Sequence, residues 1–303
     1  MDYNAIASIF LLPTADEIAP PSVPDSPARR LRDATEAIAT IGWWSRSAAD
    51  AVTALGHGFF DGYVWGRAAS LGADVDPSVV VSAFGVFNAT LLGPVFIQAR
   101  SISDRTTILA AREAGATEGL RQATVGISPA TIESCANMLL DALAPLEPGP
   151  RPLFGALQAL RIPTDPYGRL WRAAELVREH RGDGHLAACV AVGLNMAEMN
   201  VLTEVWLGYR VGEYSSTRGF DASQLGNAVE ALETRGWIAS GQLTAAGKVA
   251  RDAIESATDL AQHQLIRALS NSLDAICSEL DAITAAVLAA HATPADPRKR
   301  AAG

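Results

Sequence analysis

The most informative stretch of this chain is eight residues near its middle, Arg178-Glu179-His180-Arg181-Gly182-Asp183-Gly184-His185. They include two of the five histidines, two arginines and two carboxylates, and the flanking segments are mostly Ala, Leu and Val. Such polar groups are costly to bury unless each finds a partner in the protein or in a ligand. The stretch therefore indicates where a functional site is to be sought.

These eight residues are predicted to form a corner between two helices. Residues 167–180 have a helical pattern, and Gly182 suits the left-handed conformation that often follows the end of a helix. Asp183 can cap the next helix through its carboxylate, and we expect that helix to span residues 184–207. The corner would bring polar side chains from two helices together.

Three interpretations of the corner are open. It can be structural, with His180 favoured by a helix C-terminus, Arg181 paired with an acid and His185 bonded locally. It can be the polar wall of a small-molecule pocket, where His180 or His185 transfers protons and Arg181 holds an anionic or enolic oxygen. A zinc site would need at least three ligands, such as both histidines and Asp183. We disfavour zinc because Asp183 is more simply a cap, and because on one unbroken helix the histidines would lie about 140° apart.

The composition favours an all-α protein. Hydrophobic residues make up 49% of the 303 residues, aromatic residues only 6%, and alanine is abundant. A sizeable core of closely packed helices is therefore expected. The net charge of -9 argues against a protein whose main work is to grip phosphate backbones, so DNA is an unlikely partner. Lysine occurs only at Lys248 and Lys299, so most positive charge is arginine, which suits carboxylate recognition and buried ion pairs.

Several classes of protein are disfavoured by what the sequence lacks. The three cysteines, Cys135, Cys189 and Cys277, have no paired spacing, which predicts reduced, buried thiols. No signal peptide and no membrane span is predicted, so we expect a soluble, cytoplasmic protein. A Gly-rich phosphate loop, a G-x-S-x-G elbow and an HExxH motif are all missing from the sequence, so neither a cofactor nor a metal is predicted.

Proline and glycine divide the chain into five parts. We predict a proline-rich arm over residues 1–27, an N-terminal helical domain over 28–147, a linker with a short helix over 148–166, a C-terminal helical domain over 167–291 and a tail over 292–303. Ser26 and Pro27 favour a helix start at the end of the arm. Residues 261–291 are predicted to form one amphipathic helix that packs on its own domain or forms the seam of a homodimer.

A winged-helix pattern lies between Phe220 and Ala250. Asp221 is a helix cap, Gly236 ends that helix, and residues 237–243 can form a minimal hairpin. Thr244 then caps the following helix. Across the winged segment, from Thr217 to Gln242, two arginines face three carboxylates, so the basic surface that DNA binding needs is missing.

A second concentration of unusual residues is Trp43, Trp44, Tyr63 and Arg67. Tyr63 and Arg67 are four residues apart and would share one helix face. Aromatic residues at this spacing are more often core, but with so few aromatics elsewhere they also suit a pocket for a flat small molecule.

Asn88 and Glu198 lie in otherwise apolar helical stretches, where a buried polar side chain needs a partner. Either can contribute to the same cavity or only cross-link helices.

The sequence resembles a family of actinobacterial helix-turn-helix proteins. The resemblance is carried by Pro152-Leu153-Phe154, by Leu170-Trp171 through the eight-residue stretch, by Thr217 to Phe220, by Leu232 to Trp237, and by Leu243-Thr244 with Gly247. Weaker similarity lies around Tyr63, Gly66 to Ala69 and Phe87-Asn88. The family carries no settled activity, so the resemblance implies the architecture and a shared polar site rather than a reaction.

This chain departs from the family pattern at Val64-Trp65 and at Ser70, where relatives often carry Phe-Ala and proline. Adaptation of a pocket to another ligand or simple drift would explain these changes.

The sequence predicts a helical N-terminal domain joined to a helical, winged-helix-like C-terminal domain. A small-molecule pocket is expected between them, walled by the corner and by the Trp43–Arg67 segment. The predicted activity is cofactor-independent proton transfer, such as cyclisation, isomerisation or elimination in specialised metabolism, with His180, His185 and Arg181 as catalytic residues. A ligand-responsive transcription regulator and a non-catalytic binding protein are the alternatives.

Overall fold

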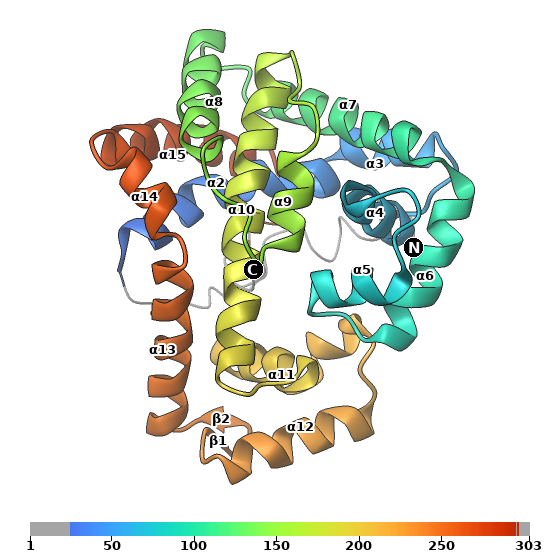
Figure 1. Ribbon diagram of the computed structural model, residues 1–303, viewed down its shortest axis with the longest axis vertical. Helices are drawn as coiled ribbons and strands as arrows, with labels where there is room; N and C mark the ends of the chain where they lie inside the picture. The colour runs from blue at the N-terminus through green and yellow to red at the C-terminus, as the bar shows by residue number, and fades with distance from the viewer. Residues whose placement is uncertain (1–24, 295, 297–303) are drawn as a thin grey trace.

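The computed structural model describes residues 25–294 and residue 296 (Figure 1). These residues fold into packed helices with one two-stranded antiparallel hairpin, so the predicted all-α class is confirmed. Most of the predicted proline-rich arm and most of the tail, Lys299 included, lie outside the described residues. The division of the chain into domains stays a prediction.

The first half of the described chain is a series of helices joined by short loops. In order these are α2 (Pro27–Trp44), α3 (Arg46–Thr53), α4 (Phe59–Ala68), the 3-10 turn η1 (Ala69–Leu71), α5 (Pro77–Phe84), α6 (Ala89–Ile102), α7 (Arg105–Ala123) and α8 (Pro129–Leu143). Most of them begin at a side-chain cap: Ser26, for example, accepts a hydrogen bond from the Arg29 amide and precedes Pro27, as predicted.

The second half is built around one long helix. Its elements are α9 (Pro152–Gln158), α10 (Pro166–Ala191), α11 (Met196–Trp206), η2 (Ser215–Arg218), α12 (Ala222–Thr234), β1 (Ile238–Ala239), β2 (Gln242–Leu243), α13 (Ala245–Leu260), α14 (His263–Leu269) and α15 (Leu273–Ala289). Helix α10 runs through the middle of the molecule, with α13 along one side and α4 to α6 on the other (Figure 1).

The predicted corner at residues 178–185 is wrong, because these residues lie inside the unbroken helix α10. Gly182 and Gly184 are helical rather than left-handed, and the chain turns only after Ala191. Asp183 does cap a helix, but a distant one: its carboxylate accepts hydrogen bonds from the Leu153 and Phe154 amides at the start of α9. Packing against neighbouring helices outweighs the cost of about 1 kcal/mol that each glycine imposes on a helix interior.

The largest part of the hydrophobic core joins the two ends of the described chain. It combines residues of α2, α7 and α8 with residues of α10, α14 and α15. The single helix predicted over residues 261–291 is wrong, since it is divided into α14 and α15 by a turn at residues 270–272. The apolar side of both helices is buried within one chain. A homodimer stays a prediction, but these apolar residues are not available as its seam.

The winged-helix segment has the predicted form. Asp221 caps α12 by accepting a hydrogen bond from the Gln224 amide, and Gly236 ends it with a φ of 70°. Ile238 pairs with Leu243 and Ala239 with Gln242, so the hairpin loop is Ser240-Gly241. Thr244 caps α13. This segment lies at one end of the molecule, beyond α11 (Figure 1).

No single helix of the described residues is long and apolar enough to cross a membrane. Helices α10 and α11 pass that test only as a pair, and they are bent by 107° at their junction.

Candidate functional site

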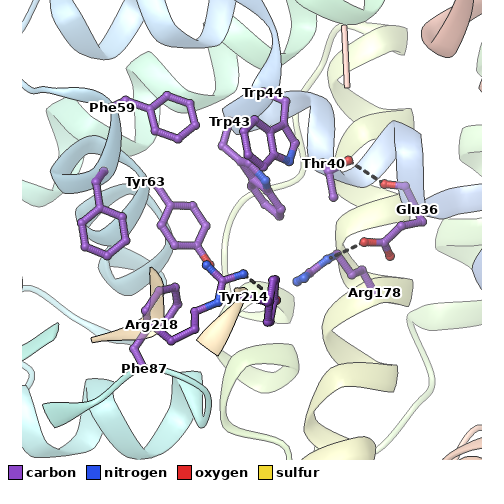
Figure 2. Close-up of a pocket in the computed structure, with 11 residues that line it drawn as sticks. Glu36, Thr40, Trp43, Trp44, Phe59, Tyr63, Phe87, Arg178, Tyr214 and Arg218 are labelled. Carbon is purple, nitrogen blue, oxygen red and sulfur yellow. Dashed lines mark hydrogen bonds and ion pairs between the residues drawn. The ribbon is translucent and has the colours of Figure 1, made fainter. Parts of the chain in front are cut away.

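A cavity of about 140 Å³ opens between α2, α4, α10 and η2, and we call it the aromatic cavity (Figure 2). Its wall is made by Glu36, Thr40, Trp43, Trp44, Phe59, Phe60, Tyr63, Phe87, Arg178, Tyr214 and Arg218. Seven of these eleven side chains are aromatic, in a chain that has only 6% aromatic residues. Most of the polar wall comes from two arginines and one carboxylate.

Local sequence places the rings at this point. Trp43 and Trp44 are the last two residues of α2, which ends because Ser45 turns to an extended conformation and caps α3. Tyr63 follows one turn into α4, whose start is marked by Gly58. Trp43 and Tyr63 meet edge to face, with their ring centroids 5.5 Å apart. The two aromatic groups found in the sequence therefore do face each other.

Arg178 enters the aromatic cavity from α10 with its charge already balanced. Its Nε donates to Glu36 Oε1 at 3.2 Å and its Nη1 donates to Glu179 Oε1 at 2.9 Å. Its guanidinium also lies 5.1 Å from the centroid of the Trp43 ring. Figure 2 shows Arg178 and Arg218 reaching toward the middle of the cavity from opposite sides.

Arg218 differs from Arg178 because it has no carboxylate partner among residues 25–294. Its Nη2 donates to the Tyr214 hydroxyl at 2.5 Å, and its Nε is buried without a partner in the described chain. The guanidinium is held over two rings, 4.9 Å from the centroid of Phe87 and 4.4 Å from that of Tyr214. This arrangement leaves a positive charge beside the cavity that a ligand's anionic group can neutralise.

The segment that carries Tyr214 and Arg218 is fixed by a buried carboxylate on α11. Glu204 accepts hydrogen bonds from the Gly212, Tyr214 and Ser215 amides and from the Ser215 hydroxyl. Because Glu204 is fully buried, these bonds hold residues 212–215 against the helix. The wall is therefore preorganised rather than loose.

A second cavity of about 100 Å³ adjoins the first, and we call it the polar cavity. Its wall shares five residues with the aromatic cavity: Tyr63, Phe87, Arg178, Tyr214 and Arg218. Its own part of the wall is made by Arg67, Ala83, Phe84, Val86, Leu153, Gly182, Asp183, His185 and Leu186. The two cavities thus bring the Trp43–Arg67 segment and the 178–185 stretch together.

Arg67 forms a forked ion pair with Glu179 across the interior. Its Nε lies 2.9 Å from Oε1 and its Nη2 lies 2.7 Å from Oε2. Burial acts to raise the pKa of Glu179, but the charges of Arg67 and Arg178 outweigh it and lower that pKa to about 2. The pKa of Arg67 is raised, because Glu179 outweighs the effect of burial. Arg67 therefore stabilises the cavity wall through its ion pair, and its charge is already neutralised by Glu179.

Asp183 uses only one of its carboxylate oxygens. Oδ2 caps α9, whereas Oδ1 is buried and accepts no hydrogen bond from any described residue. Burial, helped by the nearby charge of Glu179, raises the pKa of Asp183 to about 6 against the effect of its two backbone hydrogen bonds. Asp183 is thus a wall residue with an unused acceptor.

His185 is held in one tautomer by α13. The Thr258 hydroxyl donates to the Ile254 carbonyl at 2.8 Å, so it accepts from His185 Nδ1 at 3.1 Å. Nε2 then carries the lone pair, 3.6 Å from the Cys189 sulfur. Burial, supported by the charge of Arg251, lowers the pKa of His185 to about 4. The ring is therefore neutral and weakly basic near pH 7.

The other two predicted catalytic residues lie away from both cavities. The His180 ring meets Phe154 edge to face at 4.9 Å, and neither of its nitrogens has a partner in the described chain. Burial lowers its pKa to about 4. Arg181 pairs with Glu255 at 2.9 Å and with Asp259, both on α13. Since α10 is unbroken, the two histidines face different neighbours, α9 and α13.

Asn88 and Glu198 also lie outside the two cavities. Asn88 caps α6 and donates to Gln224 Oε1 at 2.8 Å, which links α6 to α12. Glu198 closes a capping box with Asn195 at the start of α11 and lies 3.6 Å from Arg235. Both cross-link or cap helices, which is the plainer of the two roles considered for them.

Sequence reasoning missed several wall residues, above all Tyr214 and Arg218. One signal was available: a tyrosine and an arginine four residues apart in a segment with no other periodicity. Arg178 belonged to the quoted stretch, but the expected corner hid its alignment with Gly182 and His185 along one helix face. Among the described residues, no group of three or more His, Cys, Asp or Glu side chains is placed to hold a metal ion. The cysteines are free and buried, as predicted.

Fold and cavities together define an all-α protein with a winged-helix-like segment and an aromatic-lined site. The sequence model of a helix-turn-helix family matches residues 28–294, so the chain belongs to that family. The predicted family is thus confirmed, whereas its actinobacterial origin stays a prediction. No curated protein and no solved structure matches the chain.

Proposed function

We propose that this protein binds a small, planar aromatic compound that carries an anionic group. The aromatic body would lie among Trp43, Tyr63 and Tyr214, and the anion would pair with Arg218. Ligand pockets are mostly apolar with a few placed polar groups, which is the composition of this wall. A cavity of about 140 Å³ is smaller than the roughly 300–1,000 Å³ of drug-sized sites and suits one or two rings.

The observation that carries this proposal is the state of Arg218. Each of the other two arginines in the walls, Arg67 and Arg178, has a carboxylate partner. The Arg218 guanidinium instead lies over the rings of Phe87 and Tyr214 and donates to the Tyr214 hydroxyl. A partly buried guanidinium without a counter-charge is costly in the free protein, so it indicates that a ligand supplies the charge.

Binding is better supported than the predicted proton-transfer chemistry. Of the three predicted catalytic residues only His185 lines a cavity, and its pKa of about 4 makes it a poor base near neutral pH. We therefore propose a binding protein of specialised metabolism. The cofactor-independent enzyme stays the alternative, and it would need a proton-transfer group other than His185.

Calorimetric titration tests the proposal. Benzoate and indole-3-propionate are compared with their neutral alcohols, which have the same rings. We expect the carboxylates to bind and Arg218→Gln to weaken them roughly 10- to 100-fold, the loss of one charged hydrogen bond. Arg30→Gln is the matched control, because Arg30 is an exposed arginine that pairs with Asp281 and lines neither cavity. Equal affinity for acids and alcohols, or no effect of Arg218→Gln, would contradict the proposal.

A ligand-responsive regulator is the second candidate, and one observation favours it. Arg218 ends η2, and only residues 219–221 separate it from α12, the helix that precedes the hairpin; its carbonyl accepts a hydrogen bond from the Asn88 amide. The exposed side of α12 offers Ser223, Asn227 and Glu230 and no lysine, which does not suit phosphate contacts.

DNA-binding titrations at increasing salt decide between the two. Tight, salt-dependent binding to DNA from upstream of the gene, altered by indole-3-propionate, would establish the regulator. We expect only weak binding that does not depend on sequence.

A further inference from the structure

We propose that the polar cavity is the second half of the same ligand site and that Asp183 Oδ1 accepts a hydrogen bond from an amine or hydroxyl group on the ligand. This inference rests on the proposed function, and it narrows the ligand to an aromatic acid that also carries a hydrogen-bond donor. An amino-substituted or hydroxylated aromatic acid has that chemistry.

The two cavities adjoin each other and share part of their walls. Five wall residues are common to both, and they include Arg178 and Arg218. A ligand whose ring lies against Tyr63 and Tyr214 is therefore in contact with side chains that also border the polar cavity. A substituent on that ring can extend past Arg178 toward α10.

The two carboxylate oxygens of Asp183 are used unequally. The residue is only 4% exposed, and Oδ2 accepts from the Phe154 amide at 2.9 Å and the Leu153 amide at 3.0 Å. Oδ1 has no partner in the described chain although it is buried. Buried polar atoms are nearly always hydrogen-bonded, so an unused one in a cavity wall indicates a missing donor.

The charged neighbours of Asp183 do not donate a hydrogen bond to its Oδ1. Arg67 directs Nε and Nη2 to Glu179, and Arg178 directs Nε and Nη1 to Glu36 and Glu179. His185 donates through Nδ1 to Thr258, so its Nε2 is another acceptor. None of these groups donates to Asp183 Oδ1 in the described chain, so we infer that the ligand brings the donor.

The two cavities are therefore complementary in chemistry. The aromatic cavity offers a donor with positive charge, Arg218, and the polar cavity offers the acceptor Asp183 Oδ1. A ligand with an acid at one end and an amine or hydroxyl at the other satisfies both. The raised pKa of Asp183, about 6, is consistent with this, since a cationic or donating partner would favour its ionised form.

The experiment compares acids that differ only in the donor group. Indole-3-propionate is compared with L- and D-tryptophan, and benzoate with 2-, 3- and 4-aminobenzoate and the three hydroxybenzoates, by calorimetry on the full chain. We expect at least one donor-bearing member to bind about 10- to 100-fold more tightly than its parent acid.

Asp183→Asn is the decisive variant. Its amide oxygen can still accept from the Leu153 and Phe154 amides, while an NH₂ group replaces Oδ1. The cap on α9 is thus retained and an acceptor becomes a donor. The advantage of the donor-bearing ligand should disappear, and the parent acid should bind as before. Gly182→Ala, which adds a methyl group to the same cavity wall, should reduce the same advantage and serves if Asp183→Asn does not fold.

The outcomes separate the two proposals. If the parent acids bind through Arg218 but no donor-bearing member gains affinity, only this inference fails. If a gain occurs and survives both variants, Asp183 is not the acceptor and the inference also fails. If no aromatic acid binds at all, the proposed function fails and this inference fails with it.

Discussion

On each side of α10 an arginine is paired with carboxylates, but only one of these two arginines, Arg178, borders the aromatic cavity. On the side facing α13, Arg181 reaches Glu255 and Asp259, and Glu255 also meets Arg251 and Arg29. On the side facing α4 and η2, Arg178 borders an open cavity and shares it with Arg218, which has no carboxylate partner among residues 25–294. One side is closed by counter-charges, whereas on the other we propose that a ligand supplies the charge that pairs with Arg218.

A high density of charged residues in the sequence is therefore not enough to identify a ligand site. The 178–185 stretch contains several charged residues, yet Arg178 and Asp183 line the polar cavity whereas Arg181 is closed off by Glu255 and Asp259. We expect the pairing on the α13 side to contribute to the free energy of unfolding, and Arg218 on the other side to contribute to binding of the proposed ligand. Substitutions on the two sides should therefore change different quantities.

Arg181→Ala should have the largest effect on stability. Removing one partner of a buried ion pair leaves an uncompensated charge and costs about 3–5 kcal/mol. We expect the lower end, because Glu255 keeps Arg251 and Arg29. Urea unfolding measures the change, and Arg218→Ala is the matched variant, expected to change the free energy of unfolding by less than about 1 kcal/mol. A larger loss for Arg218→Ala than for Arg181→Ala would remove the distinction between the two sides.

His180→Leu should change how stability depends on pH. Burial lowers the pKa of His180 from 6.5 to about 4, with the charges of Arg151 and His263 acting in the same direction. Below pH 6.5 the unfolded chain binds a proton that the folded protein refuses until about pH 4, so this residue makes stability fall as the pH falls. The contribution is about 3 kcal/mol across that window.

The variant should be less sensitive to acid by that amount. His185 acts in the same direction as His180, and Asp183 acts in the opposite direction because its pKa is raised to about 6. Both remain in the variant, so the difference between wild type and His180→Leu isolates His180. Unfolding is measured in urea at pH 7.5, 6, 5 and 4.5. Parallel curves for the two proteins would show that His180 is not buried in its neutral form.

Gly184→Ala should destabilise the closed side. A Cβ at this position would lie 3.0 Å from the Ala261 Cβ, just past the end of α13, which is tighter than normal contact. Overpacking costs about 1–3 kcal/mol, and the gain in helix propensity offsets about 1 kcal/mol of it. We therefore expect a net loss of about 1 kcal/mol in thermal or urea unfolding. A gain in stability would mean that α13 yields easily at this contact.

Gly182→Ala should have the smallest effect and the opposite sign. Its Cβ would meet Glu179 Oε2 at 3.6 Å, an ordinary contact, on the side of the polar cavity. Replacing a glycine inside a helix by alanine stabilises by about 0.5–1 kcal/mol. The two glycines lie two residues apart, so a stabilising Gly182→Ala beside a destabilising Gly184→Ala would show directly which side of α10 is open.

The winged-helix segment could be predicted from sequence because its signals are local. Asp221 and Thr244 each cap the helix that begins at the next residue, and Gly236 adopts a positive φ. Ser240 and Gly241 both have positive φ, as a two-residue hairpin loop requires. None of these features depends on a distant part of the chain.

The 178–185 stretch could not be predicted in the same way because its signals are tertiary. Gly184 is small where α10 approaches Ala261, and Asp183 caps a helix that starts thirty residues earlier in the chain. Read locally, the same residues resemble the end of one helix and the cap of the next. The cavity was found in part, since Trp43, Trp44 and Tyr63 were identified, but Arg218 becomes its neighbour only through the fold.

Residues 207–221, which separate α11 from α12, carry one further consequence. In a standard helix-turn-helix this connection is a turn of about three or four residues, but here it supplies Tyr214 and Arg218 to the walls of both cavities and is held by Glu204. If the proposed ligand binds there, we expect a partner that shifts α12 through this connection to change the affinity for the ligand. By thermodynamic reciprocity, the ligand must change the affinity for that partner by the same factor.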